Sequence, residues 1–120
     1  SILEQVKKIL GLAKEYTSFD VDIAIHINSV FSNLTQMGIG PEAGFAIDGY
    51  DQFWSDFTTS DALKTQQIKS YLPLKVRSIF DPPQNANVLK ALNNSIAELE
   101  HRLFIEEENS RYVEPVVEEE

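Results

Sequence analysis

The chain of 120 residues is organised around residues 69–85, which read KSYLPLKVRSIFDPPQN. Apolar side chains recur in and just before this stretch at Ile68, Leu72, Val76 and Ile79. Spacings of three or four residues place them on one face of an α-helix. Because Pro82 disfavours helical geometry at Asp81, we expect the helix to end at Phe80 or Asp81. We also expect a bend at Pro73, since proline has no N–H to donate within the helix.

A second helical pattern follows the two prolines at once. Its apolar positions are Val88, Leu89, Leu92, Ile96, Leu99 and Leu103. They predict a helix over residues 86–106. The short connection predicts that the two helices pack side by side and antiparallel.

The N-terminal part shows two further helices. Ser1 and Glu4 have the spacing of a capping box and open a short helix that ends before Gly11. Thr17 and Asp20 repeat that spacing, and a regular apolar pattern then predicts a helix over residues 20–37, ended by Gly38.

Residues 42–60 lack a helical pattern. Asp48 and Gly49 form a two-residue hairpin signal, which predicts a short β-hairpin inserted between the second and third helices. Five aromatic residues crowd this insertion, namely Phe45, Tyr50, Phe53, Trp54 and Phe57. They are either anchors that pin a loop to the core, with Trp54 inward, or part of an interface.

The expected fold is mainly α. It is a small antiparallel bundle of about four helices with a loop or hairpin insertion at residues 42–60. We expect one helical domain over residues 1–107. Residues 108–120 combine glutamates with Val113, Val116 and Val117, which cannot build a core, and predict an acidic, extended tail.

Composition narrows the class of protein. The chain has no cysteine, which excludes disulfides and thiolate chemistry and fits a reducing compartment. No apolar run reaches the length of a membrane span, and no signal peptide is visible, so we expect a soluble protein made in the cytoplasm.

The net charge of −9 is unevenly distributed. Residues 106–120 hold seven acids and one arginine. Residues 15–63 contain acids and no lysine or arginine, whereas residues 62–80 contain bases and no acid. This segregation suits either a seam between identical subunits or neutralisation within one chain. The candidate subunit-interface residues are Lys64, Lys69, Lys75, Arg77, Asp48, Asp51 and Asp56.

Motifs for catalysis or cofactor binding are missing. The sequence has no nucleophile elbow and no glycine-rich phosphate loop. Asp48, Asp51 and Asp56 lack the spacing of a calcium loop. His26 and His101 lie on different predicted helices without a catalytic grouping. We therefore expect no enzyme activity, no cofactor and no metal site, and the acidic composition argues against strong nucleic-acid binding.

Several segments resemble the head-to-tail connector (adaptor) family of tailed double-stranded DNA bacteriophages. They are residues 27–29, the run LTQMGIGP at 34–41 with Gly44 and Phe45, the run WSDF at 54–57, the runs LKVR at 74–77 and FDPP at 80–83, and the residues Glu98, Leu99, Glu100, Arg102 and Leu103. The resemblance covers about residues 2–104. Pro73 and the glutamate tail fall outside the family pattern.

This resemblance implies a structural virion protein of the head–tail neck. It implies a homomeric ring of twelve subunits that docks under the portal, carries the next neck or tail protein and extends the DNA channel. The implied partners are further copies of the chain, the portal and a neck or tail-completion protein, while DNA passes through the lumen without specific binding. Arg111, Tyr112, Val113 and Val116 are the candidate portal-docking residues. The alternative is a monomeric or dimeric helical module for protein binding, with no virion role.

Overall fold

A computed structural model describes residues 1–57 and 61–111, with side chains of the last helix described up to Ile105. The elements are α1 (Ile2–Ile9), α2 (Asp20–Gln36), the 3-10 turn η1 (Trp54–Asp56), α3 (Ala62–Phe80) and α4 (Ala86–Arg111). The predicted mainly α class is confirmed. Helix α3 ends where Pro82 and Pro83 require it to end and continues through the buried Pro73. Helix α4 runs past its predicted end at residue 106.

Side chains cap three of the helices. The Ser1 hydroxyl accepts a hydrogen bond from the Glu4 N–H and opens α1. The Asp61 carboxylate accepts one from the Leu63 N–H and opens α3. The Asn85 side-chain oxygen accepts from two N–H groups in the first turn of α4. These caps satisfy N–H groups that have no partner inside the helix, so they fix where each helix begins.

Helix α2 begins at the predicted residue, Asp20, but is capped differently. Its N-cap residue is Phe19, which makes no side-chain capping bond, so the predicted capping box of Thr17 and Asp20 is wrong. The Asp20 carboxylate is instead directed to the side chains of Lys7 and Tyr50. A tertiary ion pair has replaced the local cap.

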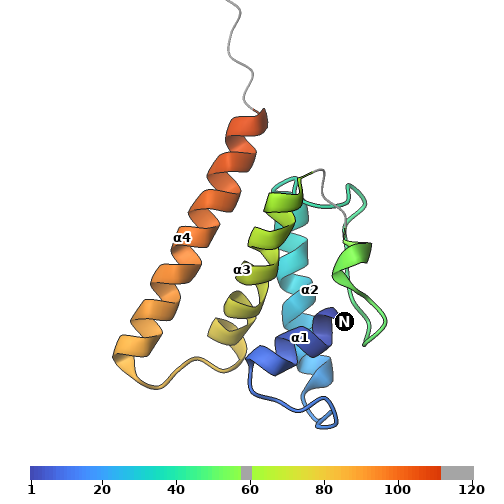
Figure 1. The fold of residues 1–120 in the computed structure, drawn as a ribbon, viewed down its shortest axis with the longest axis vertical. Coiled ribbons are helices and arrows are strands. Elements are labelled where there is room, and N and C mark those ends of the chain that lie inside the picture. The colour runs from blue at the N-terminus through green and yellow to red at the C-terminus, as the bar shows by residue number, and fades with distance from the viewer. Residues whose placement is uncertain (58–60, 112–120) are drawn as a thin grey trace, which may run out of the picture.

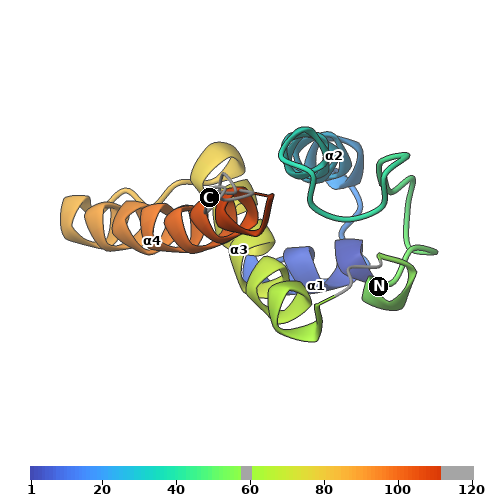
Figure 2. The ribbon, with the colours of Figure 1, turned by 90° about the horizontal axis from the view of Figure 1, so that it is seen from above.

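Helices α2 and α3 lie at the centre of the molecule. They contact each other, α1 contacts both, and α4 packs along α3 (Figure 1). Helices α3 and α4 run in opposite directions on either side of the turn at residues 81–85, as predicted. Seen from above, α2 and α4 lie on opposite sides of α3 (Figure 2). The arrangement is a three-helix core with a fourth helix added at one side.

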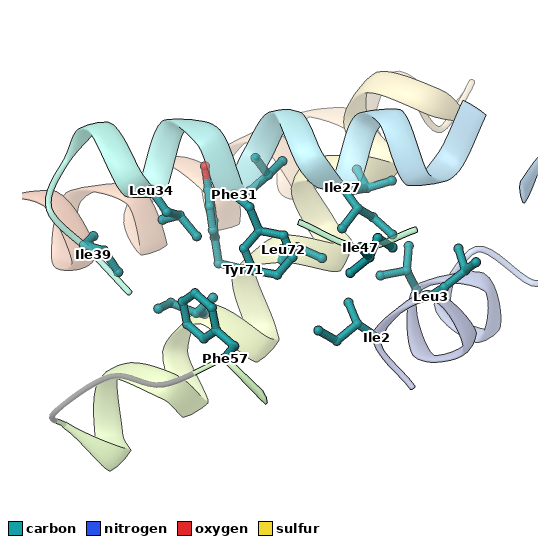
Figure 3. Packing of buried hydrophobic residues seen from close by; sticks show 14 of the residues in the cluster. Ile2, Leu3, Ile27, Phe31, Leu34, Ile39, Ile47, Phe57, Tyr71 and Leu72 are labelled. Atoms are coloured by element: carbon teal, nitrogen blue, oxygen red, sulfur yellow. The ribbon is translucent and has the colours of Figure 1, made fainter. Parts of the chain in front are cut away.

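The core joins these helices to the insertion. Figure 3 shows Phe31 and Ile27 of α2 facing Leu72 of α3. Ile39, Ile47 and Phe57, from the segment between α2 and α3, belong to the same buried cluster. Helix α4 contributes Ile96 and Leu103. The long segment after α2 is therefore part of the core, and its path is set by apolar burial.

The predicted β-hairpin is wrong, because residues 1–57 and 61–111 contain no β-strand. The tight hairpin turn that Asp-Gly favours needs a positive φ at both central residues. Neither Asp48 nor Gly49 has a positive φ. The backbone finds other partners: the Asp48 N–H donates to the Gln52 side chain, and the Gln52 carbonyl accepts from the Ile2 N–H. Side chains and α1 thus take the place of a second strand.

Candidate interaction surfaces

The best-defined polar group in the molecule is the ammonium of Lys7, which is 0% exposed. Its Nζ donates hydrogen bonds to the backbone carbonyls of Lys14 at 3.0 Å and Tyr16 at 2.8 Å, and to the Tyr50 hydroxyl at 2.7 Å. The Asp20 carboxylate lies 2.8 Å from the same nitrogen and accepts a 2.6 Å hydrogen bond from Tyr50. The three donors of the ammonium are all used. One buried charge therefore joins α1, the 11–19 loop, α2 and the insertion.

The charges in this cluster stabilise each other. Burial alone would lower the pKa of Lys7, but the hydrogen bonds and charges of Asp20 and Tyr50 outweigh it and raise that pKa. Burial alone would raise the pKa of Asp20, but the bonds from Lys7 and Tyr50 hold it below its usual value. Burial, followed by the Asp20 carboxylate, raises the pKa of the Tyr50 hydroxyl. The arrangement is a buried ion pair in which each charge stabilises the other.

The predicted aromatic anchors divide between core and surface. Phe31 of α2 is their common neighbour, with ring centroids 5.0 Å from Phe45, 5.9 Å from Trp54 and 5.3 Å from Phe57. The Trp54 indole N–H donates to the Gln5 side chain of α1. By contrast, Phe53 is 51% exposed. Most of the anchors thus fix the insertion to the core, and Phe53 is available at the surface.

The basic candidates differ in their surroundings. Lys75 lies 3.6 Å from the Glu100 carboxylate of α4, which also accepts a 3.0 Å hydrogen bond from the Tyr71 hydroxyl. Burial and this carboxylate raise the pKa of Tyr71. Lys69 and Arg77 are half-buried and make no ion pair with a described residue. Lys75 is therefore paired within the subunit, whereas Lys69 and Arg77 have no ion-pair partner in the described part of the chain.

The acidic candidates lie on the insertion and are exposed. Asp48 accepts a 2.8 Å hydrogen bond from the Gln52 side chain, and Asp56 accepts a 2.9 Å bond from the Phe53 N–H. The Asp51 side chain makes no hydrogen bond or ion pair within residues 1–57 and 61–111. None of the three pairs with the basic residues of α3 in the described part of the chain. The acidic and basic regions therefore remain separate surfaces.

The predicted portal-docking residues lie at the end of the described chain or beyond it. Tyr112, Val113 and Val116 lie outside the described residues, and Arg111 is the last residue of α4. The described residues hold no group of three or more potential metal-ligating side chains. Of the helices that the structure describes, none is both long enough and apolar enough to cross a membrane.

Sequence reasoning missed two residues of structural importance, Lys7 and Asn28. Lys7 falls four residues after Leu3 and three before Leu10, so it occupies the apolar face of α1, which was a signal of burial. The Asn28 side chain donates to the Ile47 carbonyl at 2.9 Å and accepts from the Ile47 N–H at 2.7 Å. It serves the insertion as one pair of a β-ladder would, and no sequence signal identifies that partner.

Residues 1–57 and 61–111 thus form an all-helical fold with separate acidic and basic surfaces. The comparison with protein families gives the particular assignment. The family model described as phage connector protein matches residues 2–110. The chain belongs to this family, so the resemblance found in the sequence is confirmed. Searches of curated proteins and of solved structures gave no match. The family is one of structural, virion-associated phage proteins.

Proposed function

We propose that this phage connector protein assembles into a homo-oligomeric ring between the portal and the next neck or tail protein, where it extends the DNA channel. The observation that carries the proposal, beyond family membership, is the separation of charge over the surface. Asp48 and Asp51 on the insertion and Lys69 and Arg77 on α3 pair with no opposite charge among the described residues. A head-to-tail contact between copies would neutralise both surfaces.

The net charge supports the second part of the proposal. A chain with a formal charge of −9 repels the phosphate backbone of DNA, so a channel built from it would let DNA pass without binding it. Nucleic-acid binding proteins show the opposite charge balance. A conduit is therefore a better fit than a DNA-binding role.

The portal contact is tested with purified portal protein. The full chain and a variant ending at Arg111 are each mixed with portal, and the complexes are imaged by electron microscopy. We expect the full chain to form a ring on the portal and the shortened variant to lose this docking. The circular dichroism spectrum of the shortened variant should show that its helices remain folded. The Tyr112, Val113 and Val116 assignment fails if both chains dock equally well. The connector role itself fails if neither chain docks.

A further inference from the structure

Two aliphatic side chains stand exposed on the outer face of α2. Val21 is 74% exposed and Ile25 is 59% exposed, one helical turn apart. They border a hollow of about 320 Å³ between α2 and the insertion, which also includes Ala24 and Tyr50. Isolated exposed aliphatic side chains are ordinary, but a pair on one face beside a hollow is a feature of contact surfaces.

Carboxylates accompany this pair. Asp22 follows Val21 in α2 and is exposed, and Asp48 lines the same hollow from the insertion. Neither makes an ion pair with a described residue. The surface is therefore an apolar ridge with negative charge beside it, and its complement is an apolar groove with positive charge.

The corner between α3 and α4 provides such a groove. It has a volume of about 240 Å³ and is lined by Leu74, Arg77, Pro83, Val88, Ala91, Leu92 and Ser95. Val88 is 50% exposed, and Arg77 lacks an ion-pair partner in the described part of the chain. A cavity of about 150 Å³ can hold benzene, so the groove has room for a branched aliphatic side chain.

The positions of ridge and groove suit cyclic symmetry. The first turns of α2, the last turns of α3 and the first turns of α4 all lie at the lower end of the molecule in Figure 1. Figure 2 places α2 and α4 on opposite sides of α3. Rotation about an axis along the bundle brings opposite sides of successive copies together at one height, as a closed ring requires.

We propose that the α2 ridge of one copy, Val21 and Ile25, inserts into the α3–α4 corner groove of the next copy. Asp22 then faces Arg77 across the seam. The inference rests on the proposed homo-oligomer and specifies which surfaces form its contact. The inference also assigns Arg77 to the contact between copies, whereas Lys75 is paired with Glu100 within the subunit. Burial of the ridge and groove supplies the attraction, and the charge pair fixes the orientation.

Cysteine cross-linking tests the contact directly, because the natural chain has no cysteine. Ile25→Cys and Val88→Cys variants, one of them lengthened by a tag so that the two can be told apart by mass, are mixed and oxidised. A disulfide needs Cα atoms about 4.4 to 6.8 Å apart, so it reports proximity. We expect a linked heterodimer in the mixture and no linked dimer of either variant alone. Leu63→Cys, at a 66% exposed position on α3, replaces Ile25→Cys as the matched control and should stay unlinked.

Charge reversal gives a second, independent readout. Asp22→Lys and Arg77→Glu should each lose the oligomer. An equimolar mixture of the two should recover it, because the intact Asp22–Arg77 contact then alternates with a contact in which both charges are reversed. Recovery in the mixture supports the seam. Oligomers formed by each variant alone at the wild-type concentration overturn it.

The wild-type mass separates this inference from the proposed function. If the wild type forms a ring but Ile25→Cys and Val88→Cys do not link, the ridge-and-groove seam is wrong and the ring remains. If the wild type is monomeric at every concentration and on the portal, the proposed ring fails and the seam fails with it.

Discussion

At the scale of single residues, the fold depends on the charge of Lys7, which is buried, whereas most lysines expose theirs to solvent. The Lys7 ammonium is buried and bound by two carbonyls, a hydroxyl and a carboxylate that come from three other segments. Removing one partner of a buried ion pair leaves the other charge without compensation, which is far more costly than the pair is favourable. A single substitution at Lys7 therefore removes the polar link that joins α1, the 11–19 loop, α2 and the insertion.

Lys7→Met tests that role. The methionine keeps an unbranched stem but removes the ammonium, so the Asp20 carboxylate loses its counter-charge and two backbone carbonyls lose their donor. We expect the free energy of unfolding to fall by about 3 to 5 kcal/mol. Chemical denaturation measures the loss. Lys8→Met, one residue along at an exposed position, is the control and should change stability little. Equal effects of the two substitutions would show that the buried ammonium is not important.

The same cluster predicts how stability depends on pH. The folded pKa of Asp20 lies below its unfolded value of about 3.9, so its contribution is present above that pH and is lost as the pH falls through the folded pKa. The folded pKa of Lys7 lies above its unfolded value of about 10.4, so its contribution is lost as the pH rises through the folded pKa.

Asp20→Asn should therefore lose much of the acid-dependent decrease in stability that the wild type shows below about pH 4. Denaturation curves across that range measure it. Asp22→Asn, at an exposed neighbouring position, should retain the wild-type pH dependence. If the two variants have the same acid profile, the stabilisation of the Asp20 carboxylate by Lys7 is not the cause.

At the scale of elements, the insertion is held to α2 by one side chain and by its aromatic residues. Asn28 satisfies both backbone groups of Ile47, and Phe57 packs so close to Gly40 that an added Cβ would lie 2.6 Å from its ring. Gly40 also has a φ of +89°, which side chains of other residues rarely adopt. The path of the insertion is thus fixed at two positions, at Ile47 by Asn28 and at Phe57 by its contact with Gly40.

Asn28→Ala removes the two hydrogen bonds that attach Ile47 to α2. Two backbone groups of Ile47 lose their partners, and we expect a loss of about 1 to 3 kcal/mol in the free energy of unfolding. Hydrogen exchange of the Ile47 amide should become faster. Asn33→Ala, at an exposed position of the same helix, should leave both quantities nearly unchanged. Unchanged exchange at Ile47 in Asn28→Ala would contradict the attachment.

Gly40→Ala tests the other position. Gly11, with a φ of +80° and open space around its Cβ position, is a matched control, because alanine there meets only the backbone strain. That strain costs about 1 to 2 kcal/mol. Gly40→Ala should cost about 1 to 3 kcal/mol more, since Phe57 must move as well. Thermal or chemical denaturation measures both. Equal losses would show that the contact with Phe57 adds nothing.

The helices could be predicted from the sequence because their signals are local. Apolar spacing, the caps at Ser1 and Asp61 and the prolines after Phe80 act within a few residues of the elements they define. The hairpin and the Thr17 cap were predicted wrongly because distant residues decide those segments. Asn28 binds the insertion, and Lys7 with Tyr50 binds Asp20. Local propensity gives way where tertiary hydrogen bonds satisfy the backbone instead.

For the candidate interface residues too, contacts between distant residues could not be predicted from the sequence. The separation of acidic and basic residues is visible in the sequence, but which charge pairs within the chain is not. Only the structure places Lys75 beside Glu100 and leaves Arg77 at a groove. Val21 and Ile25 lie off the buried face of α2, and only the structure shows that they are exposed beside a hollow.

At the scale of the whole molecule, the charged and apolar surfaces are those that the proposed homo-oligomer would use. The acidic insertion and the basic side of α3 are not neutralised by each other among the described residues, and aliphatic side chains are exposed at both sides of the bundle. An attraction between charged surfaces weakens with salt, whereas apolar burial does not. Raising the salt concentration should therefore slow assembly more than it dissociates the finished oligomer, which stopped-flow light scattering can follow.

The most direct test of the central claim is the solution mass of the wild-type chain, measured by multi-angle light scattering at several concentrations. We expect a discrete mass several times 13.6 kDa for the chain alone, or a portal complex whose mass exceeds that of the portal by such a multiple. A mass of 13.6 kDa at every concentration, both alone and with portal, would contradict the account and favour a monomeric interaction module.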